Sequence, residues 1–354
     1  MPVCVPKNHG VISGLTRIYF PQKGASGVEF MFGELLYLSR ADVERVALPM
    51  SEIIDLVERA FREKGGGFVE LPPKPGLHPA GDAFIHAMPA WLSRLGVAGM
   101  KWVSGYPQNQ ARGLPYITGL IILNDPETGI PRAVMDCTWV TAVRTAAATA
   151  VSAKYLARTD ARVMGILGLG VQGRANLEAV RCVRDIAEVR CYDINADRQA
   201  AFVKEMSERT GIRIVPARTP REAVEGCDIV VTAGPILRHP QPVIEPDWLS
   251  PGVLAVPLDF DSYFTPASMR AVDLFVTDDT PQYLYYREHG YFQGCPDPHA
   301  DLGDVVTGKG QAQRKQASER IMSMNLGLAI EDMVVADAVY RRAASQDLGV
   351  RLAL

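Results

Sequence analysis

The chain has 354 residues, a length that favours two domains over one. Its composition, with 47% hydrophobic and 22% charged residues, is ordinary for a folded protein and excludes a disordered, collagenous or coiled-coil chain. The formal net charge of −3 leaves no basic surplus to neutralise a phosphate backbone, so we expect no nucleic-acid partner.

The cysteines and the N-terminal segment bear on location. Six cysteines are scattered without C-x-x-C spacing in a chain too large to need disulfide staples, which predicts reduced thiols. No apolar run reaches the roughly 18 to 20 residues of a membrane-spanning helix. Residues 1–30 lack the basic start and apolar core of a signal peptide and follow no helical or strand period. We expect an irregular extension over 1–30 and a cytoplasmic protein without a membrane partner.

Regular structure is predicted from about residue 35. Ser39 followed by Asp42 is an N-cap signal for a first helix, and apolar residues at helical spacing predict a second helix over Ser51–Lys64. Short β-rich stretches separated by Pro and Gly turns then predict a mixed sheet that packs with helices. Its strands are expected at Ala83–Met88, Val97–Val103, Ile117–Leu123 and Arg132–Asp136.

The second half of the sequence predicts a parallel sheet. An Ala- and Thr-rich helix over Val140–Ala157 precedes a strand–helix alternation that continues to about residue 280, as in a doubly wound α/β domain. A last helix is predicted over Asn325–Ala343 and can return to the first domain. The parallel strands are expected at Arg162–Leu167, Glu188–Tyr192, Arg213–Val215, Ile229–Thr232, Val253–Val256 and Leu274–Thr277.

A glycine fingerprint follows the first of these strands. In the pattern G-x-G-x-x-G, Gly168 allows a tight turn, Gly170 lets backbone N–H groups approach a pyrophosphate, and Gly173 permits close packing of helix on strand. Asp193, twenty residues further on, can accept hydrogen bonds from ribose hydroxyls and would repel a 2′-phosphate. A Gly-rich turn in an ordinary α/β domain is the alternative. The coincidence of strand, helix and acid favours NAD over NADP, although Arg198 could accommodate a phosphate.

Three further motifs accompany the fingerprint in a fixed order. They are Lys101-Trp102-Val103-Ser104-Gly105-Tyr106-Pro107, Arg144-Thr145-Ala146-Ala147-Ala148 and Asn325-Leu326-Gly327-Leu328-Ala329-Ile330-Glu331-Asp332. With these motifs in this order and spacing, over about residues 35–340, the chain resembles the ornithine cyclodeaminase and mu-crystallin family.

The resemblance implies an α/β fold in which a Rossmann-type parallel-sheet domain is inserted into a mixed α+β domain. The substrate-binding and dimerisation domain would comprise residues 31–144 plus 321–354, the Rossmann NAD-binding domain residues 145–320, and two subunits would form a homodimer. The implied function is NAD-dependent hydride transfer to or from an amino acid or imine, as in an amino-acid dehydrogenase or ketimine reductase. The alternatives are a redox-neutral cyclodeaminase that releases ammonia from ornithine or a similar diamino acid, and a non-catalytic small-ligand binding protein like mu-crystallin.

The resemblance also implies a cationic clamp for the substrate. An amino-acid carboxylate needs fixed cations beside the nicotinamide, and Arg supplies a planar, bidentate one. Arg144 and Lys101 match the family positions that hold this carboxylate, and Lys74 stands where many relatives have Arg. Without the resemblance, a surface ion pair for Arg144 and a solvated amine for Lys101 would be the simpler interpretations.

Hydride removal from an amine further needs a base, because nitrogen must offer its lone pair as the C–H bond breaks. Asp259, just past a predicted strand, aligns with the catalytic acid of the cyclodeaminases, and Asp261 is the competing base. Either carboxylate could instead cap a helix that begins near Pro266. The residues after Asp259 differ from the Cys-Pro-Gly-Lys run of ornithine cyclodeaminases, which argues against ornithine itself.

The remaining expectations concern the cofactor and metals. His86 lies on an alternating strand and could face the substrate or be an interior residue. His289, Asp297 and His299 do not make a metal-ligand pattern, so no metal is expected. Further cofactor contacts are implied by the resemblance at Val171, Gln172, Thr232, Gly234 and Asn325.

Overall fold

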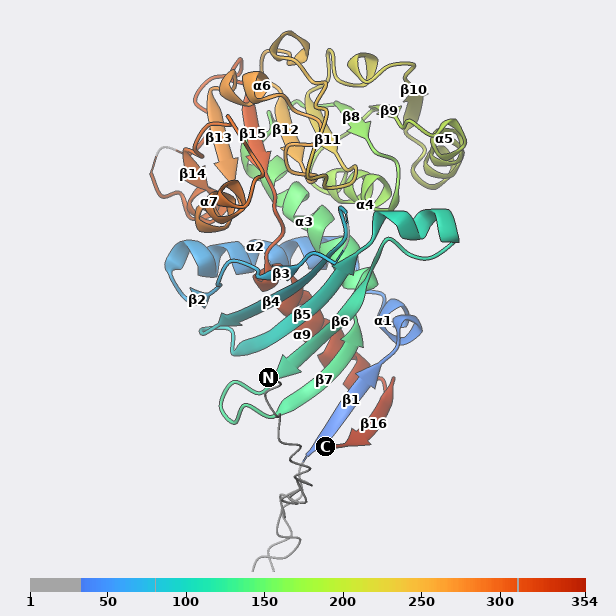
Figure 1. The fold of residues 1–354 in the computed structure, drawn as a ribbon, viewed down its shortest axis with the longest axis vertical. Helices are drawn as coiled ribbons and strands as arrows, with labels where there is room; N and C mark the ends of the chain where they lie inside the picture. Colours follow the sequence, from blue (N-terminus) through green and yellow to red (C-terminus); the bar gives the residue numbers. More distant parts are fainter. Residues whose placement is uncertain (1–32, 80, 311) are drawn as a thin grey trace, which may run out of the picture.

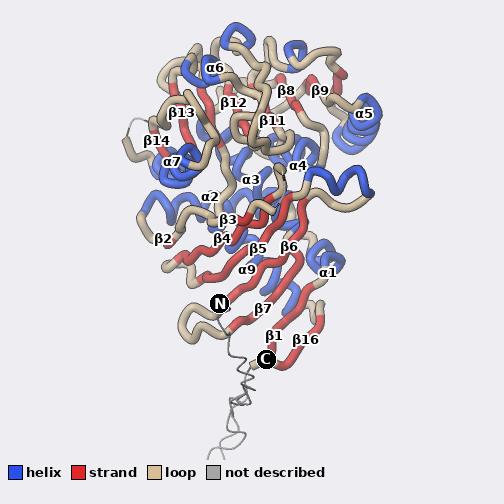
Figure 2. Tube along the Cα trace, in the orientation of Figure 1, coloured by secondary structure: helices blue, strands red, loops and turns tan. Residues whose placement is uncertain are grey.

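The computed structural model describes residues 33–79, 81–310 and 312–354, so the extension predicted at residues 1–30 lies outside the described residues. Within them the chain forms two eight-stranded sheets, a mixed sheet and a parallel sheet. The sheets occupy opposite ends of the molecule, and helix α3 (Thr138–Leu156) runs between them (Figure 1). Figure 2 shows the strands of the two sheets in separate halves.

The mixed sheet has the strand order β16-β1-β7-β6-β5-β4-β2, with β3 paired to β4. Neighbouring strands from β4 to β7 are antiparallel, and β1 is parallel to β7. The four strands predicted in this part are confirmed as β4 to β7. The strands are β1 (Glu34–Leu38), β2 (Val69–Glu70), β3 (Gly76–Leu77), β4 (Phe84–Leu92), β5 (Val97–Gly105), β6 (Ile117–Asn124), β7 (Pro131–Asp136) and β16 (Val350–Ala353).

Helices cover one face of the mixed sheet. Helix α9 (Ala329–Ser345) packs on β4, β5 and β6, while α1 (Arg40–Val46) and α2 (Met50–Gly66) pack against α9. The predicted capping signal is confirmed, because Ser39 and Asp42 form a reciprocal capping box at the start of α1. Figure 1 shows no described helix lying over the opposite face of this sheet.

The parallel sheet has the order β10-β9-β8-β11-β12-β15-β13-β14, and all its pairings are parallel. Its strands are β8 (Val163–Leu167), β9 (Glu188–Tyr192), β10 (Arg213–Pro216), β11 (Ile229–Thr232), β12 (Leu254–Pro257), β13 (Leu274–Thr277), β14 (Ala300–Asp301) and β15 (Ile321–Met324). The remaining helices are α4 (Val171–Val180), α5 (Ala196–Thr210), α6 (Pro266–Arg270), α7 (Thr280–Glu288), α8 (Leu302–Thr307) and the 3₁₀ turns η1 (Pro107–Arg112), η2 (Arg221–Ala223) and η3 (Pro246–Trp248).

Strand β15 differs from the sequence-based expectation. It lies between β12 and β13, whereas the predicted division placed residues from 321 onward with the substrate-binding domain. All four of its residues are buried, so it lacks the alternation that marks a half-exposed strand. Helix α9 also begins at Ala329, later than the predicted Asn325, because Gly327 has a φ of +80° that no helix accommodates.

The chain passes between the two halves twice. Helix α3 connects β7 to β8 and packs on α4 as well as on α2 and α9. The return path is the segment of residues 325–328 between β15 and α9, which we call the crossover segment. Lys64 at the end of α2 adds ion pairs to Asp279 (3.0 Å) and Asp301 (2.5 Å) in the other half. In the described part of the chain, no helix has the length and apolarity to span a membrane.

Candidate active site

The glycine turn lies at the carboxyl end of β8 and has the geometry of an anion cradle. Gly168 has a φ of +89°, and a Cβ there would lie 2.6 Å from the Ala233 carbonyl. A Cβ at Gly173 would lie 2.6 Å from the Gly168 oxygen, whereas one at Gly170 would meet nothing within 4 Å. Packing therefore explains the outer two glycines, while Gly170 leaves open space at the N-terminus of α4. The residues fit a dinucleotide whose pyrophosphate meets that helix end.

Asp193 follows β9 and is hydrogen-bonded to the backbone of this turn. Its Oδ2 accepts a hydrogen bond from the Leu169 N–H (2.9 Å), and its Oδ1 accepts one from the Asn195 N–H (2.9 Å). Each carboxylate oxygen keeps a further lone pair that could accept a ribose hydroxyl. Val171 and Ile194 are apolar yet 66% and 88% exposed beside the turn, as surfaces for the flat rings of a nucleotide would be.

A contact from the other half of the molecule reaches the same place. The Arg198 guanidinium lies 3.8 Å from Asp193 Oδ2 and donates to Gln110 Oε1 of η1 (3.3 Å). Because η1 belongs to the mixed-sheet half, this contact bridges the two halves beside the acid predicted to bind the ribose.

Two of the predicted substrate-binding cations meet on one carboxylate. Lys101 Nζ donates to Asp332 Oδ1 (2.8 Å), and Arg144 Nε donates to the same oxygen (2.9 Å). Arg144 Nη1 also donates to Glu331 Oε2 (2.8 Å). Both cations are buried, on β5 and α3, so neither the surface ion pair nor the solvated amine describes them.

Lys74 completes what we call the cation cluster, Lys74, Lys101 and Arg144. It precedes β3, and its Nζ donates to the carbonyls of Leu326 (2.6 Å) and Gly327 (3.1 Å) in the crossover segment. The repulsion of Arg144 and Lys101 acts on its charge, which places the three side chains in one electrostatic environment.

Burial and neighbouring charges shift the pKa values of these three cations in different directions. Burial and the nearby charge of Arg144 lower the pKa of Lys74 to about 7 and also lower that of Lys101. For Arg144, burial alone would lower the pKa, but the carboxylates of Asp332 and Glu331 raise it above its usual value. Arg144 therefore stays charged, whereas Lys74 titrates near neutrality.

Three acids balance the cation cluster, and sequence reasoning assigned a role to none of them. They are Asp278, Glu331 and Asp332. Asp278 follows β13, and its Oδ2 accepts a hydrogen bond from the Gly327 N–H (2.6 Å). Burial raises the pKa of Asp278 to about 7 and also raises that of Glu331. The available signal for Asp278 was its place just past a predicted parallel strand, the same rule that selected Asp259.

Asp259 lies just past β12 and is fully buried. Its Oδ1 accepts a hydrogen bond from Thr232 Oγ1 (2.7 Å), and its Oδ2 accepts one from the Gly234 N–H (2.7 Å). Thr232 and Gly234, predicted as cofactor contacts, thus hold this carboxylate. Burial raises the pKa of Asp259 to about 7. The competing base Asp261 accepts a hydrogen bond from the Phe292 N–H (2.8 Å).

The helix-capping interpretation of these two carboxylates is wrong. The N-cap of α6 is Thr265, whose side chain accepts a hydrogen bond from the Ser268 N–H. A threonine hydroxyl adjacent to Pro266 takes the position that an aspartate would otherwise fill. Asp259 and Asp261 are therefore free of that structural role.

Aromatic side chains lie beside Lys74 of the cation cluster. Phe260 has a left-handed φ of +60°, which costs free energy in a non-glycine residue and is commonest at functional sites. Lys74 Nζ lies 6.0 Å from the centre of the Phe260 ring and 5.6 Å from that of Tyr286. His86 stacks on Phe84 at 4.4 Å. Burial lowers the pKa of His86 to about 3, so this interior histidine is neutral.

Two more predicted cofactor residues are held by the helix between the halves. The Asn325 side chain donates to Ser152 Oγ (3.2 Å) and accepts from Ser323 Oγ (3.1 Å). Gln172 Nε2 donates to the Thr141 carbonyl of α3 (3.5 Å). Asn325 is buried at the start of the crossover segment, and Gln172 ties α4 to α3.

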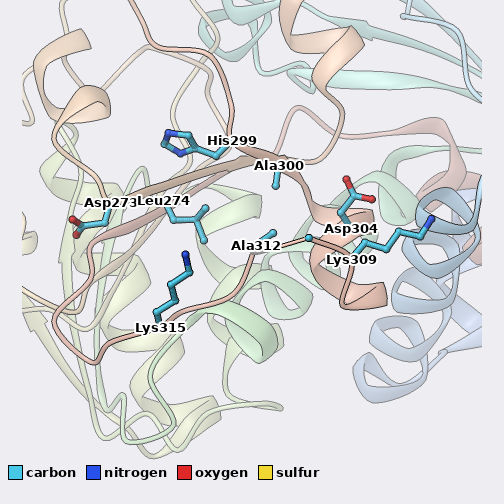
Figure 3. Close-up of a pocket in the computed structure, with 9 residues that line it drawn as sticks. Asp273, Leu274, His299, Ala300, Asp304, Lys309, Ala312 and Lys315 are labelled. Atoms are coloured by element: carbon cyan, nitrogen blue, oxygen red, sulfur yellow. The ribbon is translucent and has the colours of Figure 1, made fainter.

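A pocket of about 440 Å³ lies elsewhere and differs from this site. Asp273, Leu274 and His299, which line it, stand at the amino ends of β13 and β14 (Figure 3). Ligands of parallel sheets bind at the opposite, carboxyl edge, where the glycine turn and Asp259 lie. Among the described residues, no group of His, Cys, Asp and Glu side chains could hold a metal ion.

Comparison with known proteins identifies the family of this chain. The family model "Ornithine cyclodeaminase/mu-crystallin family" matches residues 34–347. The alanine dehydrogenase of Archaeoglobus fulgidus is 36% identical over 332 residues, which cover 90% of this chain and 98% of that protein.

Two solved structures share the whole fold. The Δ1-pyrroline-2-carboxylate reductase of Thermococcus litoralis, in complex with NADH and L-proline, has a TM-score of 0.81 and 34% identity, covering 90% of this chain and all of that one. An archaeal alanine dehydrogenase dimer with bound NAD has a TM-score of 0.80 and 34% identity, covering 90% and 99%. The inserted Rossmann-type fold is thereby confirmed, and the chain belongs to the ornithine cyclodeaminase/mu-crystallin family.

Proposed function

We propose that this protein is an NAD-dependent oxidoreductase that transfers hydride between the nicotinamide and the α-carbon of an amino acid or the corresponding imine. The observation that carries the proposal is the buried cation cluster beside the loop of Asp259. Buried cations at the carboxyl edge of a dinucleotide-binding sheet suit a small carboxylate. The activities named for the alanine dehydrogenase and pyrroline-carboxylate reductase relatives support the same reaction class.

The glycine turn and its surroundings would hold NAD. Gly170 and the N-terminus of α4 would face the pyrophosphate, Asp193 the ribose, and Val171 and Ile194 the flat rings. Gln172 and Asn325 would support the nicotinamide end. When bound, the cofactor supplies or accepts hydride. Two of the solved relatives contain NADH or NAD, which supports this choice.

Arg144 would bind the substrate carboxylate, aided by Lys101 and Lys74. The guanidinium has five N–H donors. Nε and one Nη1 donor are used on Asp332 and Glu331, which leaves the donors of Nη2 for a second carboxylate. The charges of Lys101 and Lys74 would strengthen this contact.

Asp259 would move the proton. Its two oxygens each accept one hydrogen bond and retain lone pairs, and a pKa of about 7 suits exchange in both directions near neutrality. In the oxidative direction the carboxylate would take a proton from the substrate ammonium. In the reductive direction the carboxylic acid would give it back. Because Asp259 is fully buried, a substrate must displace its present neighbours to reach it.

We also propose that two subunits pair through the open face of the mixed sheet. Trp102 of β5 pairs with Leu120 of β6 on this face, and they are 41% and 42% exposed. Tyr37 and Val350 extend the apolar surface across β1 and β16. Exposed apolar side chains that gather on one sheet face mark a protein–protein contact. The dimeric archaeal relative supports a second copy of this chain as the occupant.

We also assign a role to each half of the molecule and a location to the protein. The mixed-sheet half would bind substrate and the parallel-sheet half NAD. We infer a cytoplasmic location, because the five cysteines of the described residues are all free, as expected in a reducing compartment.

A single assay tests the reaction class. The purified protein is incubated with NADH and Δ1-pyrroline-2-carboxylate, or with pyruvate and ammonium, while NADH absorbance and free ammonia are followed. Net loss of NADH is the expected result. Ammonia release from ornithine with NAD and no net NADH would indicate a cyclodeaminase instead. Tight carboxylate binding without hydride exchange in any of these mixtures would contradict the proposal and indicate a binding protein.

A further inference from the structure

The backbone of Gly327 is held from both halves of the molecule. Asp278, at the end of β13 in the parallel sheet, accepts a hydrogen bond from its N–H (2.6 Å). Lys74, in the mixed-sheet half, donates to its carbonyl (3.1 Å) and to that of Leu326 (2.6 Å). Gln282 of α7 adds a longer contact to the same Gly327 carbonyl (3.5 Å). One residue of the crossover segment thus joins a nucleotide-side acid to a predicted substrate-binding cation.

The same glycine also contacts Arg144. A Cβ at Gly327 would lie 2.5 Å from Arg144 Nη1 and 3.1 Å from Nη2, so the guanidinium packs directly against its Cα. The φ of +80° is a second reason for glycine at this place. The backbone of Gly327 therefore contacts two of the three cations of the cluster.

We propose that Asp278 is a positioning residue for the substrate carboxylate. By holding the Gly327 amide, it fixes the carbonyls to which Lys74 is bound and the backbone against which the Arg144 guanidinium packs. The inference rests on the proposed function, because it assigns the support of the carboxylate clamp. Asp278 acts through its neighbours and need not touch the substrate.

Two physical effects make Asp278 suited to this task. A carboxylate that accepts a buried backbone N–H forms a charge-assisted hydrogen bond, and its removal leaves that N–H without a partner, which destabilises the position of Gly327. Its negative charge also offsets the repulsion that Lys74 feels from Arg144 and Lys101, and it raises the pKa of Lys74. The titratable and charged groups around Lys74 are Arg144, Lys101, Asp278, Glu331 and the neutral His86.

The pH dependence separates this role from a purely structural one. In Asp278→Asn the amide oxygen can still accept the Gly327 N–H, but the negative charge that Asp278 carries above its pKa of about 7 is gone. The pKa of Lys74, about 7 in the wild type, is then lower in the variant. Lys74 therefore loses its positive charge at a lower pH than in the wild type. Carboxylate binding by this variant should match the wild type in weakly acidic solution and fall behind as the pH rises.

The experiment measures binding of pyrrole-2-carboxylate, a planar carboxylate that cannot accept hydride, to the complex of the protein with NADH. Calorimetry is performed at pH 6 and pH 8 on the wild type, Asp278→Asn and Asp278→Ala. Asp273→Asn is the matched control, because Asp273 stands at the other end of β13 and accepts a hydrogen bond from the Arg320 N–H (2.7 Å). NADH affinity is measured in parallel by fluorescence.

We expect Asp278→Ala to weaken carboxylate binding at least tenfold at both pH values, with NADH affinity within twofold of the wild type. Asp278→Asn should stay within threefold at pH 6 and lose at least fivefold at pH 8, while Asp273→Asn changes neither. Unchanged carboxylate binding in Asp278→Ala, or equal losses of NADH and carboxylate affinity in both variants, would overturn this inference alone. If Asp278→Ala does not fold, the asparagine variant decides.

The outcome for the wild type separates this inference from the proposed function. Carboxylate binding without turnover of any imine would overturn the proposed function and leave the positioning role standing. A wild type that binds no carboxylate would overturn both.

Discussion

Arg144 stands in an unusual ionic environment for a substrate-binding residue. It is buried and already paired with Glu331 and Asp332, which keep its guanidinium charged and fixed in one orientation. Removing one partner of a buried ion pair is costly, because the remaining charge loses its compensation. The two acids thus prepare the guanidinium to receive a carboxylate without further ordering of the side chain.

Arg144→Lys should lower kcat/KM for a carboxylate substrate about a hundredfold. A lysine keeps the charge but loses the planar fork, and the loss of charge-assisted hydrogen bonds amounts to about 3 kcal/mol. The assay is steady-state NADH oxidation with Δ1-pyrroline-2-carboxylate. Arg342→Lys, at an ion pair with Glu52 on the protein surface, is the control and should keep its activity. Equal activity of the two variants would remove Arg144 from the clamp.

Asp259 should give the reductive reaction a decline above about pH 7, because the carboxylic acid must hold the proton that it donates. Lys74 titrates in the same range and in the same direction, so a variant is needed to separate them. The Thr232 hydroxyl lowers the pKa of Asp259, and Thr232→Val should therefore move the decline to higher pH. The measurement is kcat/KM against pH for both proteins.

Asp259→Asn should reduce kcat by about 10² to 10⁴ while NADH still binds. Full activity in this variant, or a pH profile of Thr232→Val that coincides with the wild type, would show that another group moves the proton. Asp261 would then be the next base to test, because it is half-buried and burial raises the pKa of its carboxyl group as well.

The roles of Asp278, Glu331 and Asp332 could not be predicted from the sequence. Glu331 and Asp332 fall in a recognised motif, but acids in the first turn of a helix are ordinary, and nothing local shows that they pair with Arg144. Asp278 is a single acid after a strand. Only the placement of β15 beside β13 brings the crossover segment to it. These contacts join residues far apart in sequence, so periodicity and local motifs do not reveal them.

At the scale of elements, the glycine turn and α4 form the part of the site most directly readable from sequence. Gly168 and Gly173 are required by contacts inside the protein, whereas Gly170 is required by nothing that the structure contains. That difference assigns the middle glycine to the ligand and the outer two to the fold.

Gly170→Ala should therefore fold normally and lose NADH affinity at least tenfold, because its Cβ would occupy space left for the pyrophosphate. Gly173→Ala should lower the melting temperature even without cofactor, because its Cβ would lie 2.6 Å from the Gly168 oxygen. Thermal unfolding and NADH fluorescence titration check the pair. Unimpaired NADH binding by Gly170→Ala would contradict this placement of the cofactor.

Elements with a clear period, or within the strand–helix alternation, were predicted well, and strands outside both patterns were missed. β8, β9 and β11 follow from apolar runs between helical segments, and α2 follows from its apolar stripe. β15 was missed because it lies beyond the strand–helix alternation that ends near residue 280, after a polar stretch over residues 308–319. β1 and β16 were missed because they pair with each other from opposite ends of the chain, and β16 is exposed along its whole length.

For the whole molecule, the apolar face of the mixed sheet determines the expected assembly. Wild type should sediment as a dimer, and the double substitution Trp102→Glu with Leu120→Glu should give a monomer, because it places charges at the centre of the face. Val243→Glu is the control, since Val243 is similarly exposed but lies in the parallel-sheet half. Sedimentation velocity is the measurement. A dimer that survives the double substitution would assign the contact to another surface.

The proposed reaction requires hydride to move between NAD and a carbon atom that lies beside the carboxylate bound by Arg144. The most direct test supplies NADH deuterated at C4, on each face in turn, together with Δ1-pyrroline-2-carboxylate, and analyses the product by mass spectrometry. We predict one deuterium at the α-carbon of proline from one of the two labelled cofactors, and about a hundredfold slower formation of that labelled proline by Arg144→Lys. Proline without deuterium from either cofactor, or no product from any imine tried, would contradict the account.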